Sequence, residues 1–99
     1  MTKVYLYGCE ATYAGHCNFE WMAPMLGARH KLMLFLAQNE EISREDIAAS
    51  ELVRFGFVEL NIGAGRPLHV EALNDQRMHV FRQHYEGALD EGCSIVWYP

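Results

Sequence analysis

Thiols and imidazoles are the side chains of this chain that could act as nucleophiles or hold a metal ion. Cys9, His16 and Cys17 lie close together in the sequence, and His30 and His84 lie further along. A thiolate beside an imidazole forms a nucleophilic pair, and zinc prefers the same donors. The C-x2-C and H-x3-H spacings of structural zinc sites are absent, and adjacent His16 and Cys17 would point to opposite sides of an extended chain. We therefore expect no metal, no cofactor and no catalytic residue.

The segment 8–28 separates two predicted strands and matches no regular element. Connections in compact domains are usually about 4–6 residues long, and longer ones are often functional. The segment contains no lysine or arginine and is rich in aromatic side chains and methionine, which are favoured at the centres of protein interfaces. An alternative is an extra hairpin, with Tyr5–Ala11 paired to Cys17–Met22. If the segment is a working surface, its binding residues are Tyr13, His16, Phe19, Glu20, Trp21 and Met22.

The chain has a net negative charge, and its acidic residues are unevenly distributed along the sequence. Thirteen Asp and Glu against eight Lys and Arg give a net charge of -5, and the basic residues are scattered singly. Nucleic-acid binding requires clustered basic residues, so we expect no nucleic-acid partner. Glu40 and Glu41 begin an acidic cluster that surrounds only one base, Arg44. This cluster would suit a basic protein partner, and we count Glu40 and Glu41 among the binding residues.

The length of the apolar runs and the number of cysteines indicate the cellular compartment of the protein. No stretch reaches the roughly 18 apolar residues that a membrane helix needs, and the N-terminus lacks a signal-peptide pattern. Three cysteines are an odd number and too few for a disulfide framework. We expect a cytoplasmic protein with reduced thiols and no membrane partner.

The 99 residues suffice for a single domain, 1–99, in which patterning predicts four to five strands and two helices. Residues 3–7 alternate as a strand, and the apolar run 32–36 predicts a central strand buried on both faces. Ser43 is expected to cap a helix that Gly56 ends, and Asn74 or Asp75 to begin a second helix that Gly92 ends. Further strands are predicted at 57–62, with Val58, Leu60 and Ile62 on one face, and at 93–98. Residues 63–67 are predicted to form a turn, after which 68–71 return as a hairpin strand.

From residue 29 onward, the predicted order is strand, helix, strand, strand, helix, strand. This is the split βαβ pattern of ferredoxin-like folds. We therefore predict an α+β, ferredoxin-like sandwich with a mostly antiparallel sheet and two helices on one face. An extra N-terminal strand or hairpin is added at an edge.

Three functions are open from the sequence. The first is a non-catalytic binding protein that neutralises or regulates a protein partner. In its size, its acidity and its lack of motifs, the chain resembles the immunity proteins with which bacteria block toxic enzymes, and no residue is carried over from that family. The second is an enzyme or sensor whose small-molecule pocket is lined by Tyr5, Tyr7, His16, Cys17, Trp21 and Tyr98. The third is a structural subunit that dimerises through the strand at 93–98, provided that this strand lies at a sheet edge.

Overall fold

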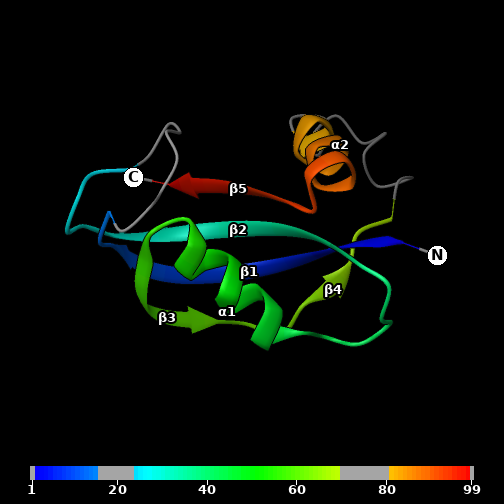
Figure 1. The fold of residues 1–99 in the computed structure, drawn as a ribbon, viewed down its shortest axis with the longest axis horizontal. Coiled ribbons are helices and arrows are strands. Elements are labelled where there is room, and N and C mark those ends of the chain that lie inside the picture. The colour runs from blue at the N-terminus through cyan, green and yellow to red at the C-terminus, as the bar shows by residue number, and fades with distance from the viewer. Residues whose placement is uncertain (1, 16–23, 70–80, 99) are drawn as a thin grey trace.

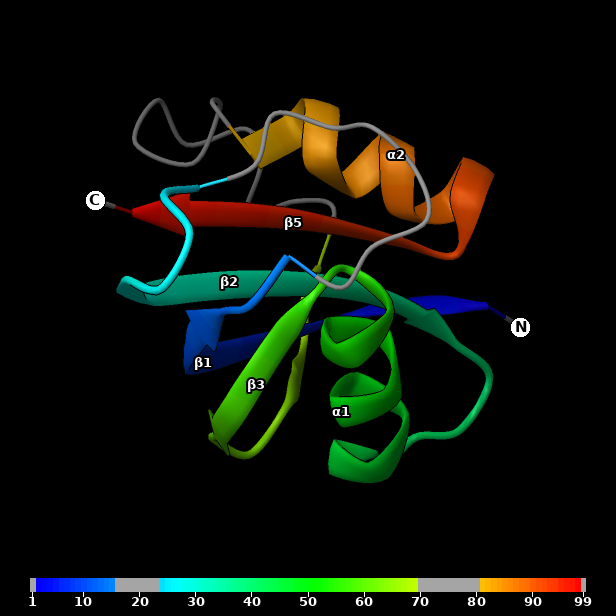
Figure 2. The ribbon, with the colours of Figure 1, turned by 60° about the vertical axis from the view of Figure 1, so that its left-hand side comes forward.

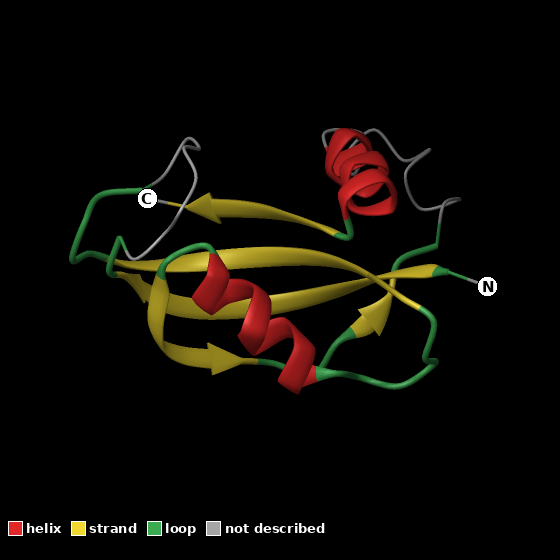
Figure 3. Ribbon diagram, in the orientation of Figure 1, coloured by secondary structure: helices red, strands yellow, loops and turns green. Residues whose placement is uncertain are grey.

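The computed structural model describes residues 2–15, 24–69 and 81–98. Figures 1 and 3 show a mixed α+β fold in which two helices accompany an antiparallel sheet. From β2 onward, the predicted order of elements is confirmed. The elements are β1 (Lys3–Tyr13), β2 (Arg29–Gln38), α1 (Glu45–Arg54), β3 (Phe57–Ile62), β4 (Arg66–Pro67), α2 (Arg82–Glu91) and β5 (Cys93–Tyr98).

The N-terminal strand lies inside the sheet rather than at its edge. The strand order is β3-β1-β2-β5, and β4 also pairs with β1. β1 is 11 residues long, so β3 pairs with its second half and β4 with its first half, while β2 occupies its other side. The expected edge position was therefore wrong. Of the alternative hairpin, Tyr5–Ala11 lies in β1 and pairs with β2, β3 and β4, and Cys17–Met22 lies outside the described residues.

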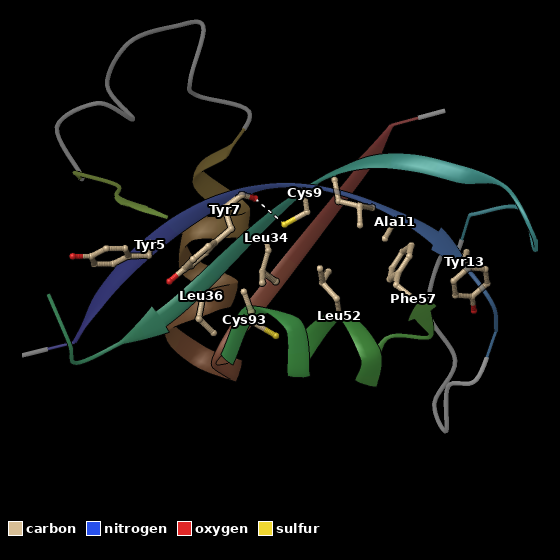
Figure 4. Close-up of a cluster of buried hydrophobic side chains, with 12 residues drawn as sticks. Tyr5, Tyr7, Cys9, Ala11, Tyr13, Leu34, Leu36, Leu52, Phe57 and Cys93 are labelled. Atoms are coloured by element: carbon tan, nitrogen blue, oxygen red, sulfur yellow. Dashed lines mark hydrogen bonds between the residues drawn. The ribbon is translucent and has the colours of Figure 1, made fainter. Parts of the chain in front are cut away.

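The two helices lie on opposite faces of the sheet, which corrects the prediction that both cover one face. Side chains alternate along a strand, so Tyr5 and Tyr7 pack in the cluster that contains Leu52 of α1, whereas Val4 and Leu6 pack against α2. In Figures 1 and 2 the two helices lie apart, with the central strands between them. Figure 4 shows the cluster beside α1. The reason for the difference is that both faces of β1 are apolar, and each face needs a cover.

A β-bulge reverses part of the alternation predicted for β3. The pairing of β1 with β3 shifts register between Glu10 and Thr12, and Glu59 has a φ of 54°. Before the bulge, Phe57 is fully buried and Val58 is 37% exposed. After it, Leu60 and Ile62 pack against the α1 side, as predicted. The extra residue thus lets Phe57 and Leu60 face the same way.

Two expected details of the loops changed. Ser43 does not cap α1, whose N-cap residue is Arg44. The Ser43 hydroxyl instead accepts a hydrogen bond of 2.7 Å from the Gly65 N–H. β4 falls inside the predicted turn 63–67. Gly56 and Gly92 do follow the helix ends, with φ of 98° and 95°, as the C-terminal stop requires. The predicted start of the second helix lies outside the described residues.

His84 gives a test of the α2 packing that depends on pH. Its ring stacks on Phe35 with centroids 5.6 Å apart, and its Nδ1 lies 2.8 Å from the Ser94 hydroxyl. Burial lowers the pKa of His84, so the unfolded chain binds the proton more readily than the folded chain. We expect the free energy of unfolding to fall as the pH is lowered from about 7.5 to about 5.5, through the unfolded His pKa.

Urea unfolding at several pH values measures this slope, and the His84→Gln variant is the control. The variant should show a shallower pH dependence over the same range, whatever its absolute stability. An unchanged slope would exclude His84 as its source.

Candidate functional site

The aromatic binding residues predicted in segment 8–28 are only partly covered by the structure. Tyr13 is 9% exposed, and its ring contacts that of Phe57 edge to face at 5.3 Å. Tyr13 is therefore a core residue, which corrects its assignment to a binding surface. Met25 and Leu26 of the same segment are 75% and 67% exposed. The remaining predicted binding residues of this segment lie outside the part of the chain that the structure describes. They are His16, Phe19, Glu20, Trp21 and Met22.

Glu40 and Glu41 are exposed as predicted, but each is paired with a base of the same chain. Glu40 Oε1 lies 2.6 Å from Arg44 Nη1, and Glu41 forms an ion pair with Lys3. Arg44 also holds Asp46 at 2.9 Å, and its hydrogen bond lowers the pKa of Asp46 to about 2. Glu40 and Asp46 thus share the single charge of Arg44, and Glu41 is paired with Lys3, so part of the negative charge of this cluster is balanced within the protein.

The loop that carries these acids is tied to the sheet by a buried polar network. The Tyr7 hydroxyl donates to Gln38 Oε1 at 2.8 Å and accepts from the Arg44 N–H at 2.7 Å. Gln38 Nε2 donates to the carbonyl groups of Glu40 and Ile42 at 2.9 and 2.7 Å. Burial raises the pKa of Tyr7, so the phenol keeps its proton. The network satisfies buried polar groups and explains why the loop leads directly into α1.

A second set of acids lies on α2. Glu86, Asp90 and Glu91 are exposed, and within the described part of the chain they take part in no ion pair. The last turn of α2 contains no basic residue, although the helix dipole disfavours acids there. The lack of nearby bases could have been noticed in the sequence, since no lysine or arginine follows Arg82. These are the acids whose charge remains for a partner.

Among the strands of the described residues, β5 lies at one end of the sheet, with β2 as its neighbour. The Ala37 N–H donates to the Gly92 carbonyl at 2.8 Å, and residues 37 and 92 lie opposite each other in the register of β2 and β5. Hydrogen-bonded pairs alternate along an antiparallel ladder. Ser94, Val96 and Tyr98 therefore bond to β2, and the backbone groups of Cys93 and Ile95 point away from the sheet.

The two edges of the sheet differ in how they are protected. At the β3 edge there are a bulge and the exposed Glu59, and the two-residue β4 pairs with β1 on the same side as β3. Bulges, charges and short strands are the usual devices against edge-to-edge pairing. β5 has none of them: its six residues, Cys93–Tyr98, include no charge and no proline, and its register with β2 is unbroken. Of the two end strands in the described part of the sheet, β5 is thus the one that lacks these devices.

The described cysteines are buried and lack the properties of nucleophiles. Burial raises the pKa of Cys9 to about 11 and that of Cys93 to about 12. The Cys93 thiol donates to Glu51 at 3.1 Å, and Arg54 donates to the same sulfur at 3.5 Å. Thiols rather than thiolates are present at neutral pH, and the thiolate is the reactive form. Across residues 2–15, 24–69 and 81–98, no three His, Cys, Asp or Glu side chains gather where they could hold a metal ion.

The small-molecule pocket predicted from six side chains does not form as a unit. Tyr5 and Tyr7 are 4% and 0% exposed and face α1. Tyr98 bonds to β2 opposite Lys31 and lies on the other face, at two-residue steps from Val96, which packs on the α2 side. His16, Cys17 and Trp21 lie outside the described residues.

No family model, no curated protein and no solved structure matches this chain. Neither α1 nor α2, the helices of the described ranges, has the length and apolar character of a membrane span.

Proposed function

We propose that this chain is a cytoplasmic binding protein without catalytic activity, which neutralises or regulates a basic protein partner by adding one of the partner's strands to β5. The observation that carries the proposal is the uncharged edge strand β5, whose Cys93 and Ile95 backbone groups point away from the sheet. Strand addition supplies affinity through main-chain hydrogen bonds, and alternate side chains supply specificity. The role is the one that immunity proteins perform.

The acids of α2 give this edge its selectivity. Asp90 and Glu91 lie in the last turn of α2, and only Gly92 separates them from β5. Their unbalanced charges attract a basic surface and speed its encounter with the edge, an effect that weakens as salt rises. Glu40 and Glu41 each form an ion pair with a base of the same chain and contribute less.

Replacing Asp90 and Glu91 together by lysine should raise stability and weaken partner binding. Each replacement changes an unfavourable interaction with the helix dipole into a favourable one, and each interaction is worth about 0.3–1 kcal/mol. We expect the free energy of unfolding to rise by about 1–3 kcal/mol, and binding to lose most of its salt dependence. Urea unfolding and a titration of the partner at low and high salt measure the two effects.

The matched control is the Glu40→Lys and Glu41→Lys double variant, which makes the same change of charge beside α1. It should bind the partner almost as well as the natural chain. If this control loses binding and the α2 variant keeps it, the Glu40 cluster is the contact surface and the assignment to α2 fails.

The partner is identified by native mass spectrometry of the protein captured at low salt from its host lysate. A stoichiometric complex with a basic protein, lost in the α2 variant, supports the proposal. A chain that is recovered alone with a bound small molecule contradicts it.

A second candidate function is a dimerising subunit, favoured by the position of β5 at the sheet edge. A second copy could pair antiparallel along β5 through a two-fold axis. Both copies would then bring the same α2 acids, so salt should strengthen this dimer, whereas it weakens a complex with a basic partner. Sedimentation of the purified protein at low and high salt separates the two.

A further inference from the structure

The sheet face that carries α2 also contains an open hollow, which is lined mainly by strand residues. Its volume is about 470 Å³, within the range of small-molecule sites. It spans four strands. Gly8 and Glu10 follow Leu6 at two-residue steps along β1, so their positions lie on the same sheet face as Leu6, the face that carries α2. Its principal lining residues are Gly8, Glu10, Lys31, Met33, Asn61 and Tyr98.

Gly8 is the residue of this hollow that the fold leaves unexplained. It lies in the interior of the central strand β1, in unbroken register with Met33 of β2, and the glycines with positive φ lie elsewhere. Within the described part of the chain, a Cβ atom added at Gly8 would meet no atom within 4 Å. Neither backbone conformation nor packing therefore requires glycine, although glycine weakens a strand interior. A bare backbone at such a place suits the close approach of a ligand.

The polar groups around Gly8 indicate the chemistry of that ligand. Across the described ranges, Lys31 takes part in no ion pair. Glu10 faces it across the strands but lies 3.5 Å from Arg29 instead. Asn61 lies on the far side of Glu10 and supplies an amide. The Tyr98 hydroxyl donates to the Met33 sulfur at 3.1 Å, a weak acceptor that a ligand can replace.

We infer that this hollow binds a planar aromatic carboxylate. The ring lies over the bare backbone at Gly8, beside the thioether of Met33, with Tyr98 on the far side of Met33. The carboxylate pairs with the Lys31 ammonium and accepts from the Asn61 amide. The inference goes beyond the proposed function and does not depend on it, because the hollow lies on a face of the sheet and the strand-pairing groups lie at its edge.

The test is a titration of the full chain with naphthoate, followed by amide NMR, with naphthamide as the uncharged control probe. We expect saturable shifts at the amides of Gly8, Lys31 and Asn61 with naphthoate and much weaker ones with naphthamide. Lys31→Gln should weaken naphthoate binding at least about tenfold, since it removes the charge-assisted bond. Lys3→Gln, which removes a cation already paired with Glu41, should leave binding unchanged.

Gly8→Val fills the hollow without touching the polar groups and completes the test. The variant should keep or raise the melting temperature and abolish the saturable shifts. A lower melting temperature would mean that the chain itself uses the space above Gly8, which overturns the inference. Equal binding of naphthoate and naphthamide, or no saturable shift at these amides, overturns it as well.

Discussion

Replacing Tyr7 by alanine should lower the free energy of unfolding by about 3–5 kcal/mol, the usual range for loss of a fully buried aromatic ring. Tyr7 is 0% exposed and packs in the cluster that faces α1 (Figure 4). Its ring occupies the place that a side chain at Gly65 would need: a Cβ atom there would lie 2.4 Å from the ring carbon Cε1. Its loss therefore leaves a cavity between the sheet and the loop after β3. Urea unfolding of the purified variant measures the change.

The Tyr7→Phe variant separates the hydroxyl from the ring. It keeps the packing but leaves Gln38 Oε1 and the Arg44 N–H without their partner, which should cost about 1–3 kcal/mol. Tyr98→Phe is the matched control, because Tyr98 is 38% exposed and its hydroxyl donates to the Met33 sulfur, a weak acceptor; its change should stay within about 0.5 kcal/mol. If Tyr7→Phe were as stable as the natural chain, the network would not be what holds the acidic loop.

Replacing Ile95 by lysine should weaken binding of the protein partner by at least about a hundredfold, equivalent to about 2.7 kcal/mol. A lysine in an edge strand blocks further pairing, and several main-chain hydrogen bonds are lost together. Ile95 is half-buried at the margin of the core, and the long lysine stem can cover the same apolar surface. Titration of the captured partner measures the effect.

Two further variants keep this result interpretable. Val58→Lys places the same charge on β3 at the opposite edge of the sheet, where Val58 is already 37% exposed, and should bind normally. Ile95→Pro removes the outward N–H together with the isoleucine side chain, and leaves the β2 bonds of Ser94 and Val96 in place. Partner binding that survives both changes at Ile95 would rule out β5 as the pairing edge.

Local patterns predicted the elements well. The apolar run 32–36 forms a buried central strand, because β2 is covered on both faces, and Leu34 and Phe35 are 0% exposed. Gly56 and Gly92 could be predicted at the helix ends because a helix stop commonly needs a positive φ, which glycine adopts more easily than other residues. The position of β1 could not be obtained in this way. The alternation of Val4 and Leu6 with Tyr5 and Tyr7 would be the same whether the strand lay at an edge of the sheet or in its centre. Its position is decided by the pairing with β3 and β4, which the local sequence does not show.

The candidate site was predicted less well because charge balance depends on contacts between distant parts of the chain. Glu41 looked uncompensated, yet its base is Lys3, which β1 brings to it from the start of the chain. The bulge at Glu59 likewise turned Val58 outward and Phe57 inward. The roles of Phe19 and Trp21 stay predictions, since both lie outside the described residues.

The most direct test of strand addition is amide hydrogen exchange in β5, detected by NMR with and without the partner. The structure predicts that the amides of Ser94 and Val96, which bond to β2, exchange slowly in the free protein, and that the amide of half-buried Ile95 exchanges fast; Cys93 is 4% exposed, so Ile95 is the decisive amide. On binding, the Ile95 amide should become protected, since the partner's strand accepts its hydrogen bond. Unchanged exchange at this amide, with protection appearing instead in the loop around Glu40 and Glu41, would contradict the account.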